Sequence, residues 1–242
     1  MAGKMKISII IPAYNEEGSI VKNLKSVMEN FPDAEVILVD DASTDGTKSA
    51  GRKFKQAKYI RNTVNRGKGY SIKRGVLAAK GDIVIFTDAD LPFGTSGIKD
   101  IILAFEKDPT LDVVIAEKNA YSRSLAYKFA RKIVHIFIRV VFLLPFHDTQ
   151  AGLKGFSRVA AGKIFPKTFV SGFASDVEML FLAKQAQSKI QTVTLDVSHY
   201  PKRLSYFNFR EGIFFVRDLI RIRFHSYKDA KISLCEQNSE EV

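Results

Sequence analysis

Ile83-Val84-Ile85-Phe86-Thr87-Asp88-Ala89-Asp90 is a short apolar run that leads directly into two carboxylates. Gly81 and Pro92 bound the run, which predicts a buried strand. Because alternate side chains of extended backbone point the same way, Asp88 and Asp90 can project to one side. Mg²⁺ and Mn²⁺ take oxygen ligands and commonly bridge substrate phosphates, so two neighbouring carboxylates predict a metal-diphosphate site. The alternative is that these aspartates are only turn and cap residues.

The length and composition indicate one domain, and the charge indicates an anionic partner. The chain has 242 residues, of which 46% are hydrophobic, so we expect a single domain over residues 1–230 and a disordered tail over 231–242. The net charge of +11 indicates nucleic acid, an acidic membrane or phosphorylated substrates as partner. The single cysteine excludes an intrachain disulfide framework. We recognise no signal peptide and no apolar stretch long enough to span a bilayer, which predicts a cytoplasmic protein.

Apolar periodicity predicts strands that alternate with helices. Strands are expected at residues 6–12, 35–39, 59–60, 83–86, 112–116 and 192–197. Helices are expected at residues 20–31, 43–55, 65–81, 97–106, 122–144, 174–186 and 208–224, and a polar loop at 147–155. Polar residues gather after the strands. This order is typical of an α/β fold with a mostly parallel central sheet flanked by helices, with the ligand at the carboxyl ends of the strands.

Two of the expected helices combine cationic and apolar faces. Residues 122–144 and 208–224 both carry arginines along one side and large apolar residues along another. Such helices can lie in the plane of an anionic membrane surface. The alternative is ordinary packing of the apolar face with the arginines in solvent.

Four segments in order resemble the GT-A glycosyltransferases of family 2. They are Ile11-Pro12-Ala13-Tyr14-Asn15-Glu16, Val39-Asp40-Asp41-Ala42-Ser43-Thr44-Asp45-Gly46-Thr47, Asn65-Arg66-Gly67-Lys68-Gly69 and Asp88-Ala89-Asp90. Asp148-Thr-Gln-Ala-Gly-Leu-Lys-Gly-Phe156 and Asp176-Val-Glu178 narrow the resemblance to the dolichyl-phosphate mannose and glucose synthases. The resemblance covers roughly residues 6 to 205.

The resemblance implies an inverting enzyme with a Rossmann-like GT-A fold. Such an enzyme moves mannose or glucose from GDP-mannose, UDP-glucose or a related nucleotide sugar to dolichyl or polyprenyl phosphate at the cytosolic membrane face. Asp148-Thr-Gln inclines towards the glucose synthases. In the donor site, Pro12, Tyr14 and Glu16 would line the base and ribose pocket, Asp40 or Asp41 would accept hydrogen bonds from the base, and Asp88 and Ala89 would contact the nucleotide.

The resemblance also implies a bound Mg²⁺ or Mn²⁺. Asp90 would be its main ligand, with Asp88 beside it, and the ion would bridge the donor diphosphate. The sequence departs from the mannose synthases at Pro92, where they often carry a glutamine ligand. We therefore expect water, phosphate or another residue to complete the coordination.

A phosphate acceptor changes what catalysis requires. Its second pKa is about 6, so it is largely dianionic at neutral pH and needs positioning and cations more than a base. By resemblance, Arg131 and Arg203 would supply cations near the phosphates. Asp148 is the first candidate for a site acid and Asp176, with Glu178, the second. A loop cap and a helix N-terminal acid are the alternatives for Asp148 and Asp176.

Two other functions fit parts of the sequence. A family 2 enzyme that adds sugar to a saccharide would need a dedicated base. A nucleic-acid-binding module fits the charge, but acids at the strand ends would repel phosphodiesters, so we expect no nucleic acid. With no spanning segment predicted, we expect peripheral attachment to the cytosolic face of a membrane, directly or through a membrane-spanning partner subunit.

Overall fold

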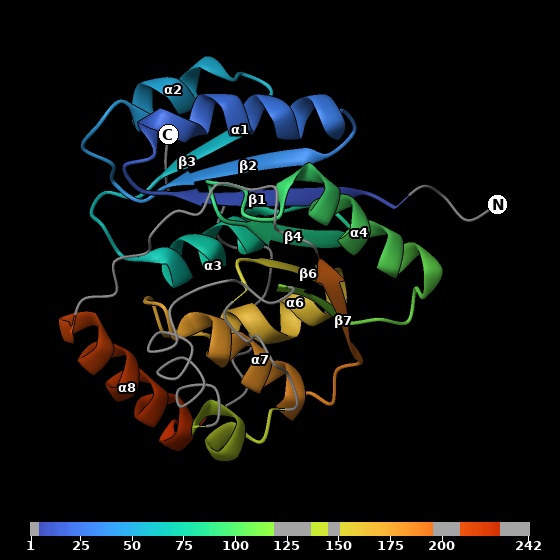
Figure 1. The fold of residues 1–242 in the computed structure, drawn as a ribbon, viewed down its shortest axis with the longest axis vertical. Helices are drawn as coiled ribbons and strands as arrows, with labels where there is room; N and C mark the ends of the chain where they lie inside the picture. The colour runs from blue at the N-terminus through green and yellow to red at the C-terminus, as the bar shows by residue number, and fades with distance from the viewer. Residues whose placement is uncertain (1–4, 119–136, 145–150, 196–208, 228–242) are drawn as a thin grey trace.

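The computed structural model describes residues 5–118, 137–144, 151–195 and 209–227 (Figure 1). Within these ranges, seven strands form one sheet in the order β3-β2-β1-β4-β6-β5-β7. The strands are β1 (Ile7–Ala13), β2 (Glu35–Asp40), β3 (Lys58–Arg61), β4 (Ile83–Thr87), β5 (Val113–Lys118), β6 (Leu153–Ser157) and β7 (Ile190–Leu195). The helices are α1 (Glu17–Asn30), α2 (Thr47–Lys53), α3 (Lys68–Ala78), α4 (Gly94–Lys107), α6 (Arg158–Ile164), the 3₁₀ helix η1 (Phe165–Lys167), α7 (Ser175–Gln185) and α8 (Phe209–Phe224).

The sheet is mostly parallel, as the sequence predicts. Strands β1, β2, β3 and β4 run parallel to one another, and β5 pairs parallel with β7. Strand β6 is inserted antiparallel between β4 and β5. The carboxyl ends of β1, β2 and β4 therefore meet at one edge of the sheet.

The prediction of a loop over residues 147–155 is wrong from Leu153 onwards. Residues 153–157 form strand β6, which pairs with β4 so that Leu153 lies opposite Thr87. The charge of Lys154 and the small side chain of Gly155 conceal the strand pattern in the sequence. In the structure Lys154 is fully buried, and a Cβ on Gly155 would lie 2.5 Å from Ile101 Cγ2 of α4. The glycine lets α4 pack closely on the sheet.

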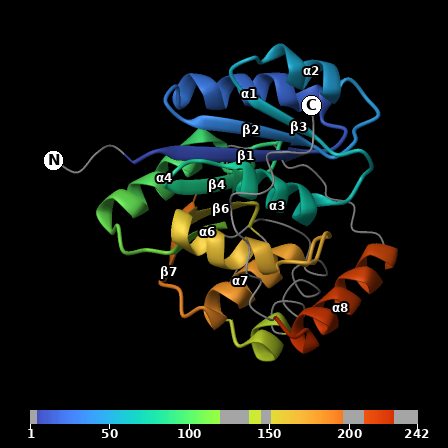
Figure 2. The ribbon, with the colours of Figure 1, turned by 180° about the vertical axis from the view of Figure 1, so that it is seen from behind.

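Helices cover both faces of the sheet, and the alternation of β1 shows why. Ile9 and Ile11 pack in a core shared with α1, α2 and α4, whereas Ile10 packs in a second core shared with α3, α6, α7 and α8. Figures 1 and 2 show these two layers from opposite sides. Each fully buried side chain of this kind stabilises the fold by about 1.5–3 kcal/mol.

The predicted helices agree with the structure in place, and their ends differ by a few residues. Helix α1 buries Ile20, Leu24 and Val27 and ends before Phe31-Pro32, because proline disfavours helical backbone in the residue before it. Of the predicted helix 122–144, residues 137–142 are helical, and the rest up to 136 lies outside the described residues. No helix in the described ranges is long and apolar enough to cross a membrane.

Candidate functional site

The loops after β1, β2 and β4 form the candidate site. The loop after β1 carries Tyr14, whose side chain is 47% exposed at this edge of the sheet, whereas Pro12 is buried within the strand. Asn15 has the left-handed φ of +54°, and its backbone N–H donates to Ser43 Oγ at 3.0 Å. The backbone N–H of Glu16 donates to Thr47 Oγ1 at 2.7 Å. The first two loops are thus joined by hydrogen bonds, with the aromatic ring of Tyr14 exposed beside them.

Asp40 organises the loop after β2 from within. Its buried carboxylate accepts hydrogen bonds from Ser43 N at 2.8 Å and Tyr59 Oη at 2.5 Å, and it forms an ion pair with Arg61. Burial disfavours the charged carboxylate, but the hydrogen bonds and the Arg61 charge outweigh burial, so the pKa of Asp40 is lowered. In this structure Asp40 is occupied by protein donors, and its contact with a nucleotide base stays a prediction.

Asp41 holds the glycine turn that starts α3. Its carboxylate accepts hydrogen bonds from the backbone N–H of Arg66 at 2.9 Å and of Gly67 at 2.7 Å, and from Asn62 Nδ2 at 2.6 Å. Gly67 has a φ of +93°, which a side chain would strain. Asp41 therefore fixes the position of the next residue, Lys68, and its contact with a base likewise stays a prediction.

Four side chains of alternating charge are linked by ion pairs beneath the site. We call Asp88, Lys68, Asp176 and Lys154 the Lys-Asp chain. Lys68 Nζ lies 2.7 Å from Asp88 Oδ1 and 3.6 Å from Asp176 Oδ2. Lys154 Nζ lies 2.6 Å from Asp176 Oδ1 and also donates to Ala151 O. The side chains of Lys154 and Asp176 are 0% and 4% exposed, whereas those of Lys68 and Asp88 are 23% and 33% exposed. The Lys-Asp chain therefore leads from the core of the protein to the surface of the site.

Neighbouring opposite charges favour the ionised state of Lys68 and of Asp176 within the Lys-Asp chain. Burial alone would lower the pKa of Lys68, but the charges of Asp176 and Asp88 outweigh it and raise this pKa. Burial alone would raise the pKa of Asp176, but the charges of Lys154 and Lys68 lower it instead. A carboxylate held between two ammonium groups accepts a further proton poorly. The arrangement thus favours a positioning role for Asp176 over the role of a base.

Asp90 and Asp88 are the residues that can hold a divalent cation. Both follow β4, and Ala89 between them is held by a hydrogen bond from Asn23 Nδ2 to Ala89 O at 2.7 Å. Among the described residues, no three histidine, cysteine or acidic side chains gather into a closed metal site. Mg²⁺ is usually held by one or two carboxylates together with substrate phosphates, so two aspartates at an open edge fit such an ion.

A comparison with known protein families identifies the family to which this site belongs. The sequence model described as "Glycosyl transferase family 2" matches residues 8–165, which include all three loops of the site. The chain belongs to glycosyl transferase family 2. The predicted family is therefore confirmed, and the chain is a glycosyltransferase.

The relatives of this glycosyltransferase include several dolichyl-phosphate beta-glucosyltransferases. The protein of that name from Dictyostelium discoideum is 29% identical over 90% of this chain and 74% of its own length. The Saccharomyces cerevisiae protein is 28% identical over 78% of this chain and 66% of its own length. The Homo sapiens protein is 26% identical over 74% of this chain and 63% of its own length. The chain thus spans about two thirds to three quarters of the length of these relatives.

Solved structures confirm the GT-A fold. Glucosyl-3-phosphoglycerate synthase from Mycobacterium tuberculosis, in complex with phosphoglyceric acid, matches 90% of this chain and 79% of its own with a TM-score of 0.70 and 21% identity. The same enzyme in complex with Mn²⁺, UDP and glucosyl-3-phosphoglycerate matches with a TM-score of 0.69 and 21% identity. At this identity the likeness concerns the fold.

The structure brings together most of the site residues predicted for this family 2 enzyme. Seven of them lie at the carboxyl ends of β1, β2 and β4 or in the loops that follow, namely Tyr14, Glu16, Asp40, Asp41, Asp88, Ala89 and Asp90. Asp176 lies at the start of α7. Arg131, Asp148 and Arg203 lie outside the described residues. Sequence reasoning gave no role to Lys68 and Lys154. Lys68 could have been found, because it lies within the family motif Asn65-Arg66-Gly67-Lys68-Gly69. Nothing in the sequence indicated that Lys154 is buried.

Replacing Gly152 with alanine is expected to damage the site more than the fold. An added Cβ would lie 1.9 Å from Asp88 Oδ2, so the Asp88 carboxylate, which is ion-paired with Lys68, must shift from its position. We expect glycosyl transfer to fall at least about tenfold, since small displacements in a site cost this much or more. Gly162→Ala on α6 is the matched control, because its Cβ meets nothing within 4 Å. Equal transfer rates for Gly152→Ala and the wild-type protein would contradict the role given to Asp88.

Proposed function

We propose that this family 2 enzyme transfers glucose from UDP-glucose to dolichyl or polyprenyl phosphate, with inversion at the anomeric carbon. The observation that carries the proposal is its similarity, over most of the chain, to dolichyl-phosphate beta-glucosyltransferases from organisms as distant as Dictyostelium discoideum and Homo sapiens. These names support glucose over mannose, in line with the Asp148-Thr-Gln motif. The acceptor would be reached at the cytosolic face of a membrane.

The donor would bind across the carboxyl ends of β1, β2 and β4. The exposed ring of Tyr14 can stack on the base, with Pro12 and Glu16 beside it. Asp90, with Asp88, would hold Mg²⁺ or Mn²⁺, and the ion when bound would neutralise the charge of the donor diphosphate. The Mn²⁺ and UDP in a solved structure of the same fold support this arrangement. Lys68 is partly exposed beside Asp88, so its ammonium group can also contact the donor phosphates.

The acceptor phosphate would itself be the nucleophile: its oxygen would attack the anomeric carbon of the donor sugar, and UDP would be the leaving group. A phosphate monoester is largely dianionic at neutral pH and needs no base to become a nucleophile. The ion pairs of Asp176 support a reaction without a protein base. This carboxylate is paired with two lysines and would accept a proton poorly. Arg131 and Arg203 would offset the repulsion between the acceptor and donor phosphates. Asp148 would orient one of these arginines or the acceptor phosphate.

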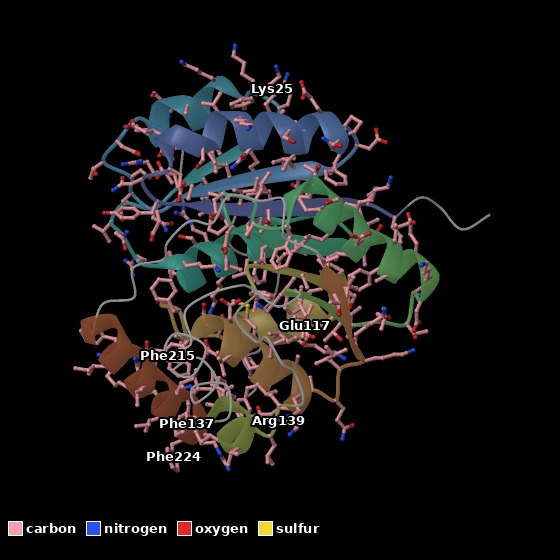
Figure 3. The ribbon with its side chains drawn as sticks, viewed as in Figure 1. Lys25, Glu117, Phe137, Arg139, Phe215 and Phe224 are labelled. Carbon is pink, nitrogen blue, oxygen red and sulfur yellow. The ribbon has the colours of Figure 1, made fainter. Side chains whose placement is uncertain are left out.

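The membrane contact would be made by the outer face of α8 together with residues 137–143. Along α8, Ile213, Ile220 and Phe224 are 54%, 52% and 82% exposed, although this helix has a second apolar face in the core. The last turn of α8 lies beside the helical residues 137–142, where Val140 and Leu143 are 67% and 70% exposed (Figures 1 and 2). Figure 3 shows Phe137, Arg139 and Phe224 at this end of the molecule.

Exposed arginines accompany this apolar face. The side chains of Arg217 and Arg221 are 55% and 54% exposed, and Arg139 and Arg223 are also exposed. Apolar side chains that enter the headgroup region, with arginines beside them, fit an anionic lipid surface. A membrane-spanning partner subunit could add to this attachment.

The wild-type protein is expected to co-sediment with vesicles that contain 30% phosphatidylserine, a fraction chosen to be about that of an acidic leaflet. Ile220→Ser combined with Phe224→Ser should lose most of this binding, because two side chains that enter the lipid are removed. Val21→Ser on α1 is the control, since Val21 is 46% exposed on a different helix. Vesicle binding that is unchanged in the double variant would contradict this surface.

A panel of acceptors tests the proposed reaction. The protein is incubated with UDP-[¹⁴C]glucose, MnCl₂ and either dolichyl phosphate, dolichol or a glucose-terminated oligosaccharide. We expect label in the organic phase with dolichyl phosphate alone, because dolichol lacks the nucleophilic phosphate. Transfer to the oligosaccharide instead would show that the enzyme uses a saccharide acceptor and would overturn the proposal.

A further inference from the structure

The carboxylate of Glu178 holds a loop through hydrogen bonds. Glu178 lies on α7 and is 0% exposed. Its Oε1 accepts the backbone N–H of Phe169 at 3.0 Å, and its Oε2 accepts that of Val170 at 2.9 Å. We call residues 168–172, which lie between η1 and α7, the strap. Glu178 thus uses both oxygens to fix the middle of the strap.

The strap is in close backbone contact with the glycine turn that carries Lys68. Gly69 N donates a hydrogen bond to Ser171 O at 2.8 Å. A Cβ on Gly67 would lie 2.5 Å from Ser171 O, and one on Gly69 would lie 2.5 Å from Val170 O. Contacts this short leave no room for a side chain on either glycine. The position of Lys68 between them therefore depends on where the strap lies.

Asp176 contacts Lys68 directly, whereas Glu178, on the same helix, contacts the strap that packs on the turn of Lys68. Residues two apart on a helix point in different directions. Asp176 points to the ammonium group of Lys68, at 3.6 Å, whereas Glu178 points to the strap behind the backbone of Lys68. One helix therefore supports both the charged end and the backbone of this lysine.

The other side of the strap meets the C-terminal end of α8. The ring of Phe169 packs against that of His225, with 4.3 Å between ring centroids, and Arg221 lies over the Phe169 ring at 5.1 Å. Tyr227 Oη lies 3.1 Å from Glu178 Oε1, to which it donates a hydrogen bond. The strap therefore joins the end of α8 to the start of α3 by direct contacts on both sides.

We propose that Glu178 is a positioning residue that sets the donor affinity by seating the turn of Lys68, and that the strap couples α8 to this turn. This inference rests on the proposed donor site. Displacement of the end of α8 would move Phe169 and Tyr227, and through the strap the backbone of Gly69. A surface contact made by α8 would in this way change how firmly the enzyme binds the nucleotide.

Glu178→Gln tests the inference by two readouts that need no acceptor. The first is amide hydrogen exchange of a peptide that contains Gly69, and the second is the Kd for UDP with MnCl₂, measured by calorimetry. The amide side chain of glutamine offers one acceptor where two are needed, so the strap should loosen. We expect exchange at Gly69 to accelerate at least about tenfold and the Kd for UDP to rise about tenfold, since fixed geometry carries much of the affinity.

A matched variant separates positioning from loss of stability. Ser157→Ala removes the N-cap of α6, where Ser157 Oγ accepts the backbone N–H of Ala160, and should cost about 1 kcal/mol of stability without touching the strap. Unchanged exchange and UDP affinity are expected there. If Glu178→Gln lowers Tm while leaving exchange at Gly69 as in Ser157→Ala, Glu178 is only structural and the inference is overturned.

Tyr227→Phe keeps the test decisive should Glu178→Gln not fold. It removes one hydroxyl and leaves both bonds from Glu178 to the strap in place. Faster exchange at Gly69 in this variant would support the coupling, and unchanged exchange would overturn it. Failure to detect any glucosyl lipid would contradict the proposed acceptor alone, because neither readout uses it. If wild-type protein bound no UDP, the donor site would fall, and the exchange data would still decide the coupling.

Discussion

Lys154→Met is expected to lower the free energy of unfolding by about 3–5 kcal/mol, the usual effect of breaking a buried ion pair. Methionine fills a similar volume but leaves Asp176, at 4% side-chain exposure, without its nearest cation at 2.6 Å. Lys68 remains at 3.6 Å and compensates only in part. Urea unfolding followed by circular dichroism measures the change.

Two controls show whether the loss comes from the uncompensated charge. Lys25→Met removes an exposed lysine that lies 3.7 Å from Glu29 on α1, and little change in stability is expected. Lys154→Met combined with Asp176→Asn should recover part of the lost stability, because no buried carboxylate is then left unpaired. If Lys154→Met is as stable as the wild-type protein, the buried pair does not support the fold as we describe.

Asp90→Asn is expected to reduce glucosyl transfer at least about 100-fold, since stabilisation of diphosphate charge by a metal ion is worth several kcal/mol. Asparagine keeps the shape of the side chain but removes the charge that would hold the cation. The rate is measured with UDP-[¹⁴C]glucose and dolichyl phosphate at a series of MnCl₂ concentrations. Higher MnCl₂ should restore part of the activity if the variant only binds the ion more weakly.

Asp82→Asn is the matched control for this prediction. Asp82 is an exposed aspartate at the opposite end of β4, where its carboxylate accepts the backbone N–H of Lys6 at 2.9 Å. The same chemical change there should leave transfer unaffected. Equal activities of Asp90→Asn and Asp82→Asn over the whole MnCl₂ series would show that Asp90 does not hold a required metal ion.

The sequence predicted the half of the fold in which short-range patterns decide the structure. Strands such as β4 are continuous apolar runs, and their acids follow at the carboxyl ends, so the sheet edge and its loops could be placed. The family motifs then indicated which residues share that edge. Glycines at positions 67 and 69 were visible as part of a motif, although the reason, close contact with the strap, was not.

The missed features depend on contacts between distant segments. Strand β6 carries a lysine in its interior, and a charged residue normally argues against a buried strand. Lys154 can be buried because Asp176, 22 residues later, supplies the opposite charge. Likewise the sequence predicts Asp176 and Glu178 only as candidate acids, because the lysines and backbone groups that contact them come from other parts of the chain. Such pairings follow from the tertiary structure and leave no local pattern.

The most direct test of the proposed reaction is the structure of its product. Purified protein is incubated with MnCl₂, dolichyl phosphate and an equimolar mixture of UDP-glucose and GDP-mannose, and the lipid fraction is examined by mass spectrometry and by NMR of the anomeric proton. We predict one hexosyl phospholipid, in which glucose is joined to the phosphate in the β configuration. A mannosyl or α-linked product, or no glycolipid from protein that still binds UDP, would contradict the account.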